Sequence, residues 1–283
     1  MDVIHETNDE QARMWNGPSG QAWVENQELL DEIYKPFEEL IISAVSAKPR
    51  RSVLDVGCGA GATTLAVARG PGAAKAAPYV QGVDISEPLI AVARARAERE
   101  GVPAEFISAN AQVYPFEPAR FDLIISRFGV MFFDDPVAAF ANLRHAARAG
   151  GELRVIAWRS AASNPFMTTA EGAAAPLLPN LPARKPNAPG QFAFADERRV
   201  HAILEESGWA DIELRPIDVA CTLPEAELVR YLTRLGPVGR ALEDVDASTR
   251  ADVTEVVRAA FEPFVHGGEV RFNAACWMIG ARS

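Results

Sequence analysis

One short segment restricts the fold of this 283-residue chain more than any other. The run Ser52–Val56 leads into three glycines spaced two residues apart, Gly57, Gly59 and Gly61, and a helical pattern follows. Glycine carries no Cβ and tolerates positive φ, so this spacing predicts a strand, a tight turn whose backbone N–H groups approach a ligand, and a helix. Such a unit is the first half of a βαβ motif.

Further short apolar runs alternate with helical patterns after this turn. The runs Tyr79–Asp84, Ala104–Ala109, Phe121–Ser126 and Leu153–Trp158 predict four more strands. The apolar residues of Phe121–Ser126 run on continuously, which is typical of a strand buried on both faces of a parallel sheet. The alternation therefore predicts an α/β core with a doubly wound, mostly parallel sheet.

Helix boundaries in this core carry their own signals. Ser86 and Asp135 are predicted N-caps, because each stands just before a helical pattern with proline in its first turn. The two helices are expected to end at Gly101 and at Gly150.

The remaining segments depart from this rhythm. Residues 1–50 are helical in pattern, with Leu29, Ile33 and Phe37 on one face, and Pro36 is expected to kink or split the helix. Residues 160–195 contain six prolines, which predicts an inserted lid with one short helix near 166–177.

The last third of the chain is expected to complete the sheet. It should contain a helix over 196–206, a strand over 211–214, a helical insertion at about 224–266 and a final strand near 269–281. The expected organisation is thus an N-terminal helical cap over 1–50, a cofactor-binding core over 51–159, a lid over 160–195 and the completed core over 196–283.

The net charge of the chain indicates which classes of binding partner are favoured. Acidic residues number 38 and Lys plus Arg 28, which gives a net charge of −10. Because nucleic-acid binding needs the opposite sign, a small-molecule partner is favoured, and a homodimer is compatible with the composition. The sequence has neither a signal-peptide pattern at its start nor an apolar run of about 18 residues, so we expect a cytoplasmic protein without a membrane span.

The three cysteines, Cys58, Cys221 and Cys276, lie far apart and form no CxxC pair. Neither a disulfide framework nor a zinc site is expected from that spacing. Asp135 as an N-cap also accounts for the pair Asp134-Asp135 without a metal.

The glycine turn alone fits two cofactors. Gly57, Gly59 and Ala62 match the dinucleotide pattern GxGxxG/A, and Asp84 is placed to hold a ribose, as in nicotinamide-dependent oxidoreductases. Asp55 favours the other cofactor. A carboxylate inside the strand would lie near an anionic pyrophosphate, whereas it would complement the ammonium and sulfonium charges of S-adenosylmethionine.

Several segments in order resemble the motifs of class I S-adenosylmethionine-dependent methyltransferases. Val53–Gly61 resembles motif I, and Gly82–Ser86 resembles the second motif, whose acid binds the ribose hydroxyls. Asn110–Phe116 resembles the segment beside the adenine, with Asn110 in place of the usual Asp. Ala149–Leu153 resembles the family's PGG turn with Ala149 in place of Pro. The resemblance extends over about 52–158.

Within that superfamily, Arg127–Phe133 and Trp15–Gly17 are most similar to the ubiquinone/menaquinone-biosynthesis-like subgroup (methyltransferase types 11 and 25). The resemblance implies a Rossmann-like seven-stranded sheet whose last strand is antiparallel. It implies methyl transfer from S-adenosylmethionine, with S-adenosylhomocysteine as product, to carbon, oxygen or nitrogen of a small-molecule acceptor. A non-catalytic binding protein with the same fold is the other alternative besides the oxidoreductase.

The resemblance also implies a set of site residues. No catalytic base is assigned, because none of the four histidines falls at an expected strand end. The carboxyl ends of the strands should place Arg127, Phe128, Trp158 and Arg159 nearest the acceptor. The expected cofactor-binding residues are Trp15, Trp23, Asp55, Gly57, Cys58, Gly59, Gly61, Asp84, Ile85, Asn110, Ala111, Gln112 and Ser126.

Two of these assignments have alternatives. Trp15 and Trp23 either close over the cofactor or pack as anchors against the sheet. Cys58 is either a reactive thiol near a helix N-terminus or simply a residue small enough for the turn.

Overall fold

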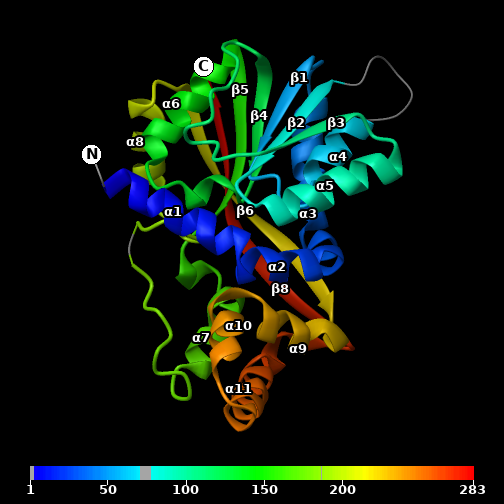
Figure 1. Ribbon diagram of the computed structural model, residues 1–283, viewed down its shortest axis with the longest axis vertical. Coiled ribbons are helices and arrows are strands. Elements are labelled where there is room, and N and C mark those ends of the chain that lie inside the picture. Colours follow the sequence, from blue (N-terminus) through cyan, green and yellow to red (C-terminus); the bar gives the residue numbers. More distant parts are fainter. Residues whose placement is uncertain (1–2, 71–77, 186) are drawn as a thin grey trace.

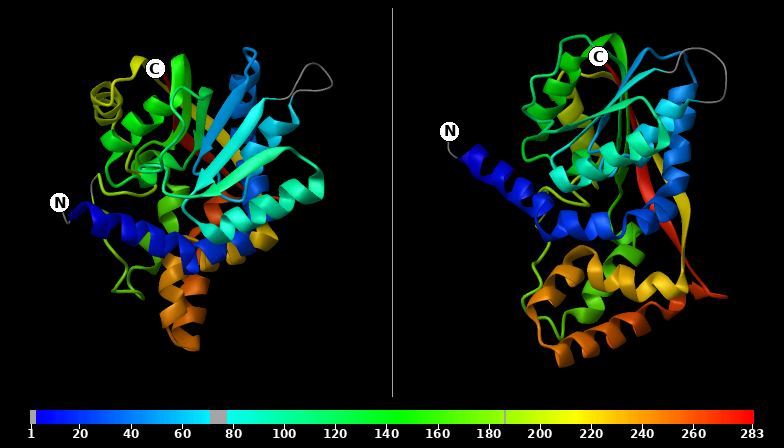
Figure 2. Two further views of the ribbon diagram at one scale, coloured as in Figure 1. Left: turned by 45° about the horizontal axis from the view of Figure 1, so that its top comes forward. Right: turned by 45° about the vertical axis from the view of Figure 1, so that its right-hand side comes forward.

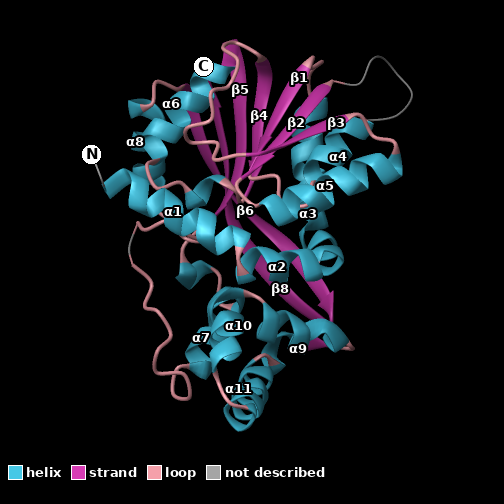
Figure 3. Ribbon diagram, viewed as in Figure 1, coloured by secondary structure: helices cyan, strands magenta, loops and turns pink. Residues whose placement is uncertain are grey.

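A single twisted sheet organises the computed structural model, which describes residues 3–70, 78–185 and 187–283 (Figures 1 and 3). The strand order is β3-β2-β1-β4-β5-β8-β6, and the short β7 pairs with β8. The strands are β1 (Ser52–Val56), β2 (Tyr79–Asp84), β3 (Ala104–Ser108), β4 (Phe121–Arg127), β5 (Ala147–Trp158), β6 (Ala210–Pro224), β7 (Val265–His266) and β8 (Glu269–Arg282).

The pairing directions confirm the expected fold class. Strands β3, β2, β1, β4 and β5 pair in parallel, whereas β8 is antiparallel to both of its neighbours, β5 and β6. The last long strand is therefore the reversed one, as the resemblance implied.

Helices cover both faces of the sheet (Figure 3). Helices α3, α4 and α5 lie on one face, and α6 and α8 lie on the other. The helices are α1 (Val3–Asn16), α2 (Pro18–Glu25), α3 (Gln27–Ser46), α4 (Ala62–Arg69), α5 (Glu87–Glu100), α6 (Pro136–Ala146), α7 (Phe166–Ala174), α8 (Glu197–Glu206), α9 (Glu225–Arg234), α10 (Gly236–Ala241) and α11 (Ala247–Ala260). In these described ranges no helix is long and apolar enough to cross a membrane.

The predicted caps are confirmed. Of the two outcomes expected at Pro36, a kink or a split, the split is wrong. Ser86 accepts from the Leu89 N–H and Asp135 from the Ala138 N–H. Helix α3 runs unbroken through Pro36. A proline removes one helical hydrogen bond, and the apolar face of α3, which includes the fully buried Ile33 and Phe37, holds the helix against the sheet.

The strands β5 and β6 are longer than the sequence pattern predicted. β6 extends over 15 residues, where only 211–214 were expected. Its side chains alternate between exposed and half-buried or buried, but the alternation changes phase at Arg215-Pro216, and a proline inside the run argued against one continuous strand. Residues 269–275 of β8 pair with β6 but not with β5, so these two strands leave the core as a ribbon.

The ribbon carries a helical cap at one end of the molecule (Figure 2). Helices α7, α9, α10 and α11 gather there, so the two insertions form one body in space. Phe166 of α7 lies at the centre: its ring stacks on Phe272 with centroids 3.8 Å apart and meets Phe261 and Phe264 edge-on.

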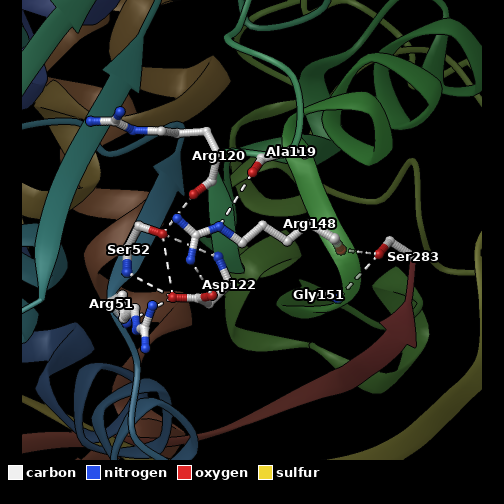
Figure 4. A network of polar contacts seen from close by, with 8 residues as sticks. All are labelled: Arg51, Ser52, Ala119, Arg120, Asp122, Arg148, Gly151 and Ser283. Atoms are coloured by element: carbon white, nitrogen blue, oxygen red, sulfur yellow. Dashed lines mark hydrogen bonds and ion pairs between the residues drawn. The ribbon is translucent and has the colours of Figure 1, made fainter.

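A polar network ties together the amino ends of the central strands (Figure 4). One carboxylate oxygen of Asp122 accepts from the backbone N–H groups of Arg51 and Ser52, and the other accepts from Arg148 at 2.9 Å. Ser283 donates to the Arg148 carbonyl and accepts from the Gly151 N–H. This edge lies opposite the carboxyl ends of the parallel strands, where ligands bind in such folds.

Candidate cofactor-binding site

The glycine turn after β1 has the conformation that its sequence demanded. Gly57, Gly59 and Gly61 have φ of +68°, +54° and +83°, values that favour glycine. A Cβ on Gly57 would lie 2.4 Å from the Cα of Gly129, so the turn and the end of β4 touch backbone to backbone. A Cβ on Gly59 would meet nothing within 4 Å. Gly59 is therefore where the turn faces open space.

Asp84 at the end of β2 connects this turn to helix α5. One carboxylate oxygen accepts from the Gly59 N–H at 2.8 Å and the other from the Ser86 N–H at 2.9 Å. Burial raises the pKa of Asp84, and these backbone donors counteract that rise only in part. Its neighbour Ile85 accepts at its carbonyl from the Asn16 side chain at 2.9 Å.

Asp55 lies inside β1 and is almost fully buried. It accepts one hydrogen bond, from the Thr64 hydroxyl of α4 at 2.7 Å. Burial raises its pKa to about 6, and the Thr64 hydrogen bond and the charge of Arg127 offset that effect only partly. A buried carboxylate with so little compensation attracts positive charge to this edge of the sheet.

Cys58 fills space in the turn. Its sulfur lies 2.8 Å from where a Cβ on Gly82 would be, beside the ring of Phe106, and its thiol is buried. Burial raises the pKa of Cys58 well above its usual value, because the thiolate would lose its solvation. The structure thus favours the small-residue interpretation over a reactive thiol.

The segment after β3 is held by its own side chains. Asn110 accepts from the Gln112 N–H at 3.0 Å, and buried Gln112 accepts from the Asp135 N–H at 3.0 Å. The Ala111 carbonyl accepts from Asn142 at 3.0 Å. These contacts fix the segment against helix α6, and its contact with adenine stays a prediction.

Ser126 positions backbone rather than presenting a free hydroxyl. The fully buried side chain donates to the Val56 carbonyl at 2.7 Å and accepts from the Gly129 N–H at 3.2 Å. It thereby clamps the ends of β1 and β4 at the point where Gly57 and Gly129 touch.

The two N-terminal tryptophans lie over the carboxyl edge. The Trp15 ring meets Trp23 and Phe132 edge-on, with centroids 5.7 and 5.2 Å apart. The Trp15 carbonyl accepts from the Ser86 hydroxyl at 2.7 Å, and Gly20 packs so closely on that carbonyl that a Cβ would lie 1.9 Å away. Helices α1 and α2 are thus anchored on the β2–α5 loop, next to Asp84 (Figure 1).

The four acceptor-facing candidates do not all meet. Phe128 stacks on Trp158 with centroids 4.7 Å apart, and both rings contact Tyr34 of α3. Arg127 donates to the Tyr34 carbonyl at 3.3 Å and lies over its ring. Arg159 instead pairs with Asp218 and lies over Trp277, away from this cluster.

Sequence patterns had missed Tyr34 and its partner in the cap. Burial raises the pKa of Tyr34 well above its usual value, and the nearby Tyr231 of α9, whose hydroxyl donates to the Met167 sulfur at 3.8 Å, adds to that rise. Burial likewise raises the pKa of Tyr231 to about 12, so both stay phenols at neutral pH. Neither residue belongs to a motif, because α3 and α9 reach this site only through tertiary packing.

Comparison with known proteins agrees with this geometry. Residues 53–151 match the methyltransferase domain family. Over 218 residues the chain is 25% identical to the demethylmenaquinone methyltransferase of Renibacterium salmoninarum, covering 74% of this chain and 88% of that protein. Residues 53–151 are therefore similar to a methyltransferase domain, in agreement with the class I S-adenosylmethionine-dependent type that the motifs resemble. The similarity to a demethylmenaquinone methyltransferase agrees with the menaquinone-type subgroup expected from the motifs.

Other proteins are similar to this chain over shorter stretches or in fold alone. An uncharacterized protein of Mycobacterium tuberculosis is 35% identical over 130 residues, which is 46% of this chain and 45% of that protein, so the match spans about half the relative. The YcgJ protein of Bacillus subtilis has the same fold, with a TM-score of 0.56 at 16% identity over 87% of this chain and 97% of its own.

Proposed function

We propose that this chain transfers the methyl group of S-adenosylmethionine to a small-molecule acceptor at the carboxyl edge of the sheet. The observation that carries the proposal is the pairing of Gly59, which faces open space, with the Asp84 carboxylate 2.8 Å from its N–H. Bound there, the cofactor supplies an electrophilic methyl group on a positively charged sulfur.

Each part of the site has a role in holding this cofactor. The oxygens of Asp84 have lone pairs left to accept from ribose hydroxyls. The carboxylate of Asp55 balances positive charge on the methionine part, since burial leaves it poorly compensated. Asn110, Ala111 and Gln112 flank the adenine, and Trp15 covers it from the N-terminal side.

The aromatic cluster at the ends of β4 and β5 forms the acceptor side. Methyl transfer requires an acceptor atom held in line with the S–CH₃ bond in a site that excludes water. Phe128 and Trp158 supply the apolar surface, and Arg127 supplies a positive charge beside it. The hydroxyls of Tyr34 and Tyr231 stay neutral there, because burial raises the pKa of each, so neither is a base.

Two groups of helices close this site in the proposed arrangement. Helices α1 and α2, within the N-terminal segment 1–50, cover the cofactor side. The lid over 160–195 and the insertion over 224–266, which pack together around Phe166, cover the acceptor side.

Calorimetry with S-adenosylhomocysteine tests the proposal. The wild-type chain should bind it, and Asp84→Ala should weaken binding roughly 10- to 150-fold, the effect of losing a hydrogen bond to a charged group. Asp218→Ala removes an exposed carboxylate on β6 and should leave affinity unchanged. Absence of binding to the wild-type chain, or equal affinity of Asp84→Ala, would refute the proposal. Binding of NADH instead would revive the oxidoreductase alternative.

A further inference from the structure

Arg127, the last residue of β4, brings a positive charge to the carboxyl edge of the sheet. Its guanidinium donates to the backbone carbonyl of Tyr34 at 3.3 Å and lies over the ring of the same residue, 5.8 Å from the centroid. Both of these partners are neutral. Over the ranges 3–70, 78–185 and 187–283, no carboxylate forms an ion pair with Arg127.

Three other arginines beside the site are each paired with a carboxylate. These pairs are Arg96 with Asp31 at 2.9 Å, Arg159 with Asp218 at 3.3 Å, and Arg234 with Glu25. Of these four arginines, only Arg127 has its charge left for a partner outside the described part of the chain.

Two nearby acids feel the charge of Arg127 without forming an ion pair with it. Asp55 lies in β1, and Glu38 lies in α3, one helical turn after Tyr34. Burial raises the pKa of each acid, and the charge of Arg127 offsets that rise only in part. Contact with cations has the opposite result at Glu152, whose pKa is lowered. The positive charge of Arg127 is therefore not neutralised where it lies.

The backbone that carries Arg127 is firmly held. The Phe128 N–H donates to the Ile156 carbonyl at 3.0 Å, and the Phe128 ring stacks on Trp158 with centroids 4.7 Å apart. Phe128 has a φ of +66°, a strained conformation that persists only where surrounding contacts fix the backbone. A charged group on such a support needs little reorganisation to bind a ligand.

Arg127 is also the accessible member of this cluster. Phe128, Trp158 and Tyr34 are buried, whereas Arg127 is half-buried. A planar guanidinium presents several N–H donors to an anionic oxygen group, and hydrogen bonds between charged partners are stronger than those between neutral ones. An anion is therefore the ligand that this residue favours.

We propose that Arg127 binds an anionic oxygen group of the acceptor, either a carboxylate or an ionised hydroxyl. This inference rests on the proposed function, and it narrows the acceptor from small molecules in general to acidic ones. Arg127 is then a specificity-determining residue, which selects acceptors by their charge at the ends of β4 and β5.

Calorimetry with two probes of the same shape tests the inference. The probe 2-naphthoate carries a carboxylate, and 2-naphthamide has a neutral amide in its place. With S-adenosylhomocysteine bound, the wild-type chain should bind the naphthoate about tenfold more tightly than the amide, or more, because a hydrogen bond to a charged group has that effect. Arg127→Gln should remove this preference, and Arg127→Lys, which keeps the charge, should retain part of it.

A matched control and a folding check accompany these variants. Arg271→Gln removes an exposed arginine that pairs with Glu269 on the ribbon, and it should show the preference of the wild type. Arg127→Gln should bind S-adenosylhomocysteine as the wild type does, which shows that the variant is folded.

A second pair of ligands distinguishes the acceptor from the cofactor. If Arg127→Gln weakens binding of S-adenosylhomocysteine but not of 5′-methylthioadenosine, which lacks the carboxylate, Arg127 holds the cofactor and the inference is overturned. Equal wild-type affinity for the two naphthyl probes, absence of naphthoate binding, or a preference that survives in Arg127→Gln also overturns it. The proposed function stands in all of these cases, provided that the wild-type chain binds S-adenosylhomocysteine. Absence of that binding refutes both.

Discussion

The variants Gly57→Ala and Gly59→Ala should distinguish two roles of the glycine turn, its contribution to stability and its contribution to cofactor binding. Both residues have positive φ, +68° and +54°. Their surroundings differ, since a Cβ on Gly57 would lie 2.4 Å from the Gly129 Cα and a Cβ on Gly59 would meet nothing within 4 Å. Both substitutions therefore carry the cost of a positive φ, but only Gly57→Ala adds a steric clash.

The magnitude follows from these two contributions. An L-residue in the left-handed region costs roughly 1–2 kcal/mol, which applies to both variants. Forcing extra volume into a packed contact costs about 1–3 kcal/mol more, which applies to Gly57→Ala alone. The atom that the new Cβ would meet is the backbone Cα of Gly129, and Ser126 holds that backbone against β1. The clash therefore cannot be relieved by rotating a side chain. The free energy of unfolding should thus be lower for Gly57→Ala than for Gly59→Ala by about 1–3 kcal/mol.

Urea unfolding and calorimetry on the same preparations provide the assay. Gly59→Ala should remain folded yet lose affinity for S-adenosylhomocysteine, since its methyl group projects into the space that the cofactor would fill. Gly57→Ala should lose stability first. Equal stability of the two variants would refute the role of the Gly57–Gly129 contact, and unchanged affinity in Gly59→Ala would refute the placement of the cofactor against the turn.

Two carboxylates give pH-dependent predictions that urea unfolding can check. Asp55 has a pKa of about 6 in the folded protein against an ordinary 3.8, so the free energy of unfolding of the wild type should fall as pH rises from 4 to 6. Asp55→Asn should lack that loss, so by pH 7 its free energy of unfolding should have gained about 3 kcal/mol relative to wild type. The same variant should bind S-adenosylhomocysteine more weakly. The pKa of Glu152 is lowered from 4.5 to about 2, because hydrogen bonds from Lys48 and Arg50 outweigh the effect of burial. At pH 7 the free energy of unfolding of Glu152→Gln should therefore be lower than that of the wild type by up to about 3 kcal/mol. This difference should shrink as pH falls through 4.5 toward 2. A pH-independent difference in either variant would contradict these assignments.

The sequence predicted the core well because its signals there are local. A buried parallel strand such as Phe121–Arg127 is apolar along its length, and caps such as Ser86 are read from two or three adjacent residues. In the ribbon, β6 does alternate, but the pattern changes phase at Arg215-Pro216, so its full length of 15 residues was not recognised. Helix α3 shows the opposite error: Pro36 predicts a break, but burial of its apolar face on the sheet outweighs one missing hydrogen bond.

The candidate site could be predicted only where one segment supplies both the backbone conformation and the proposed ligand contact. Gly57, Gly59 and Asp84 meet that condition. Tyr34 and Tyr231 do not, because each comes from a helix outside the motifs and reaches the carboxyl edge through packing that no local pattern encodes.

The pKa values of buried carboxylates shift in opposite directions at the two edges of the sheet. At the amino edge, Glu152 is held by Lys48 and Arg50, and Asp122 by backbone donors and Arg148, so the pKa of each acid is lowered despite burial. At the carboxyl edge, burial dominates, and the pKa values of Asp55 and Asp84 are raised.

Compensated acids stabilise the fold, whereas poorly compensated buried acids destabilise it unless a ligand supplies the missing charge or donors. Phe128 adds to the cost at the same edge, since its φ of +66° is strained for a residue with a side chain. The edge where parallel strands bind ligands thus concentrates unfavourable features that a partner with positive charge and hydroxyl groups would relieve. The proposed cofactor, S-adenosylmethionine, has both.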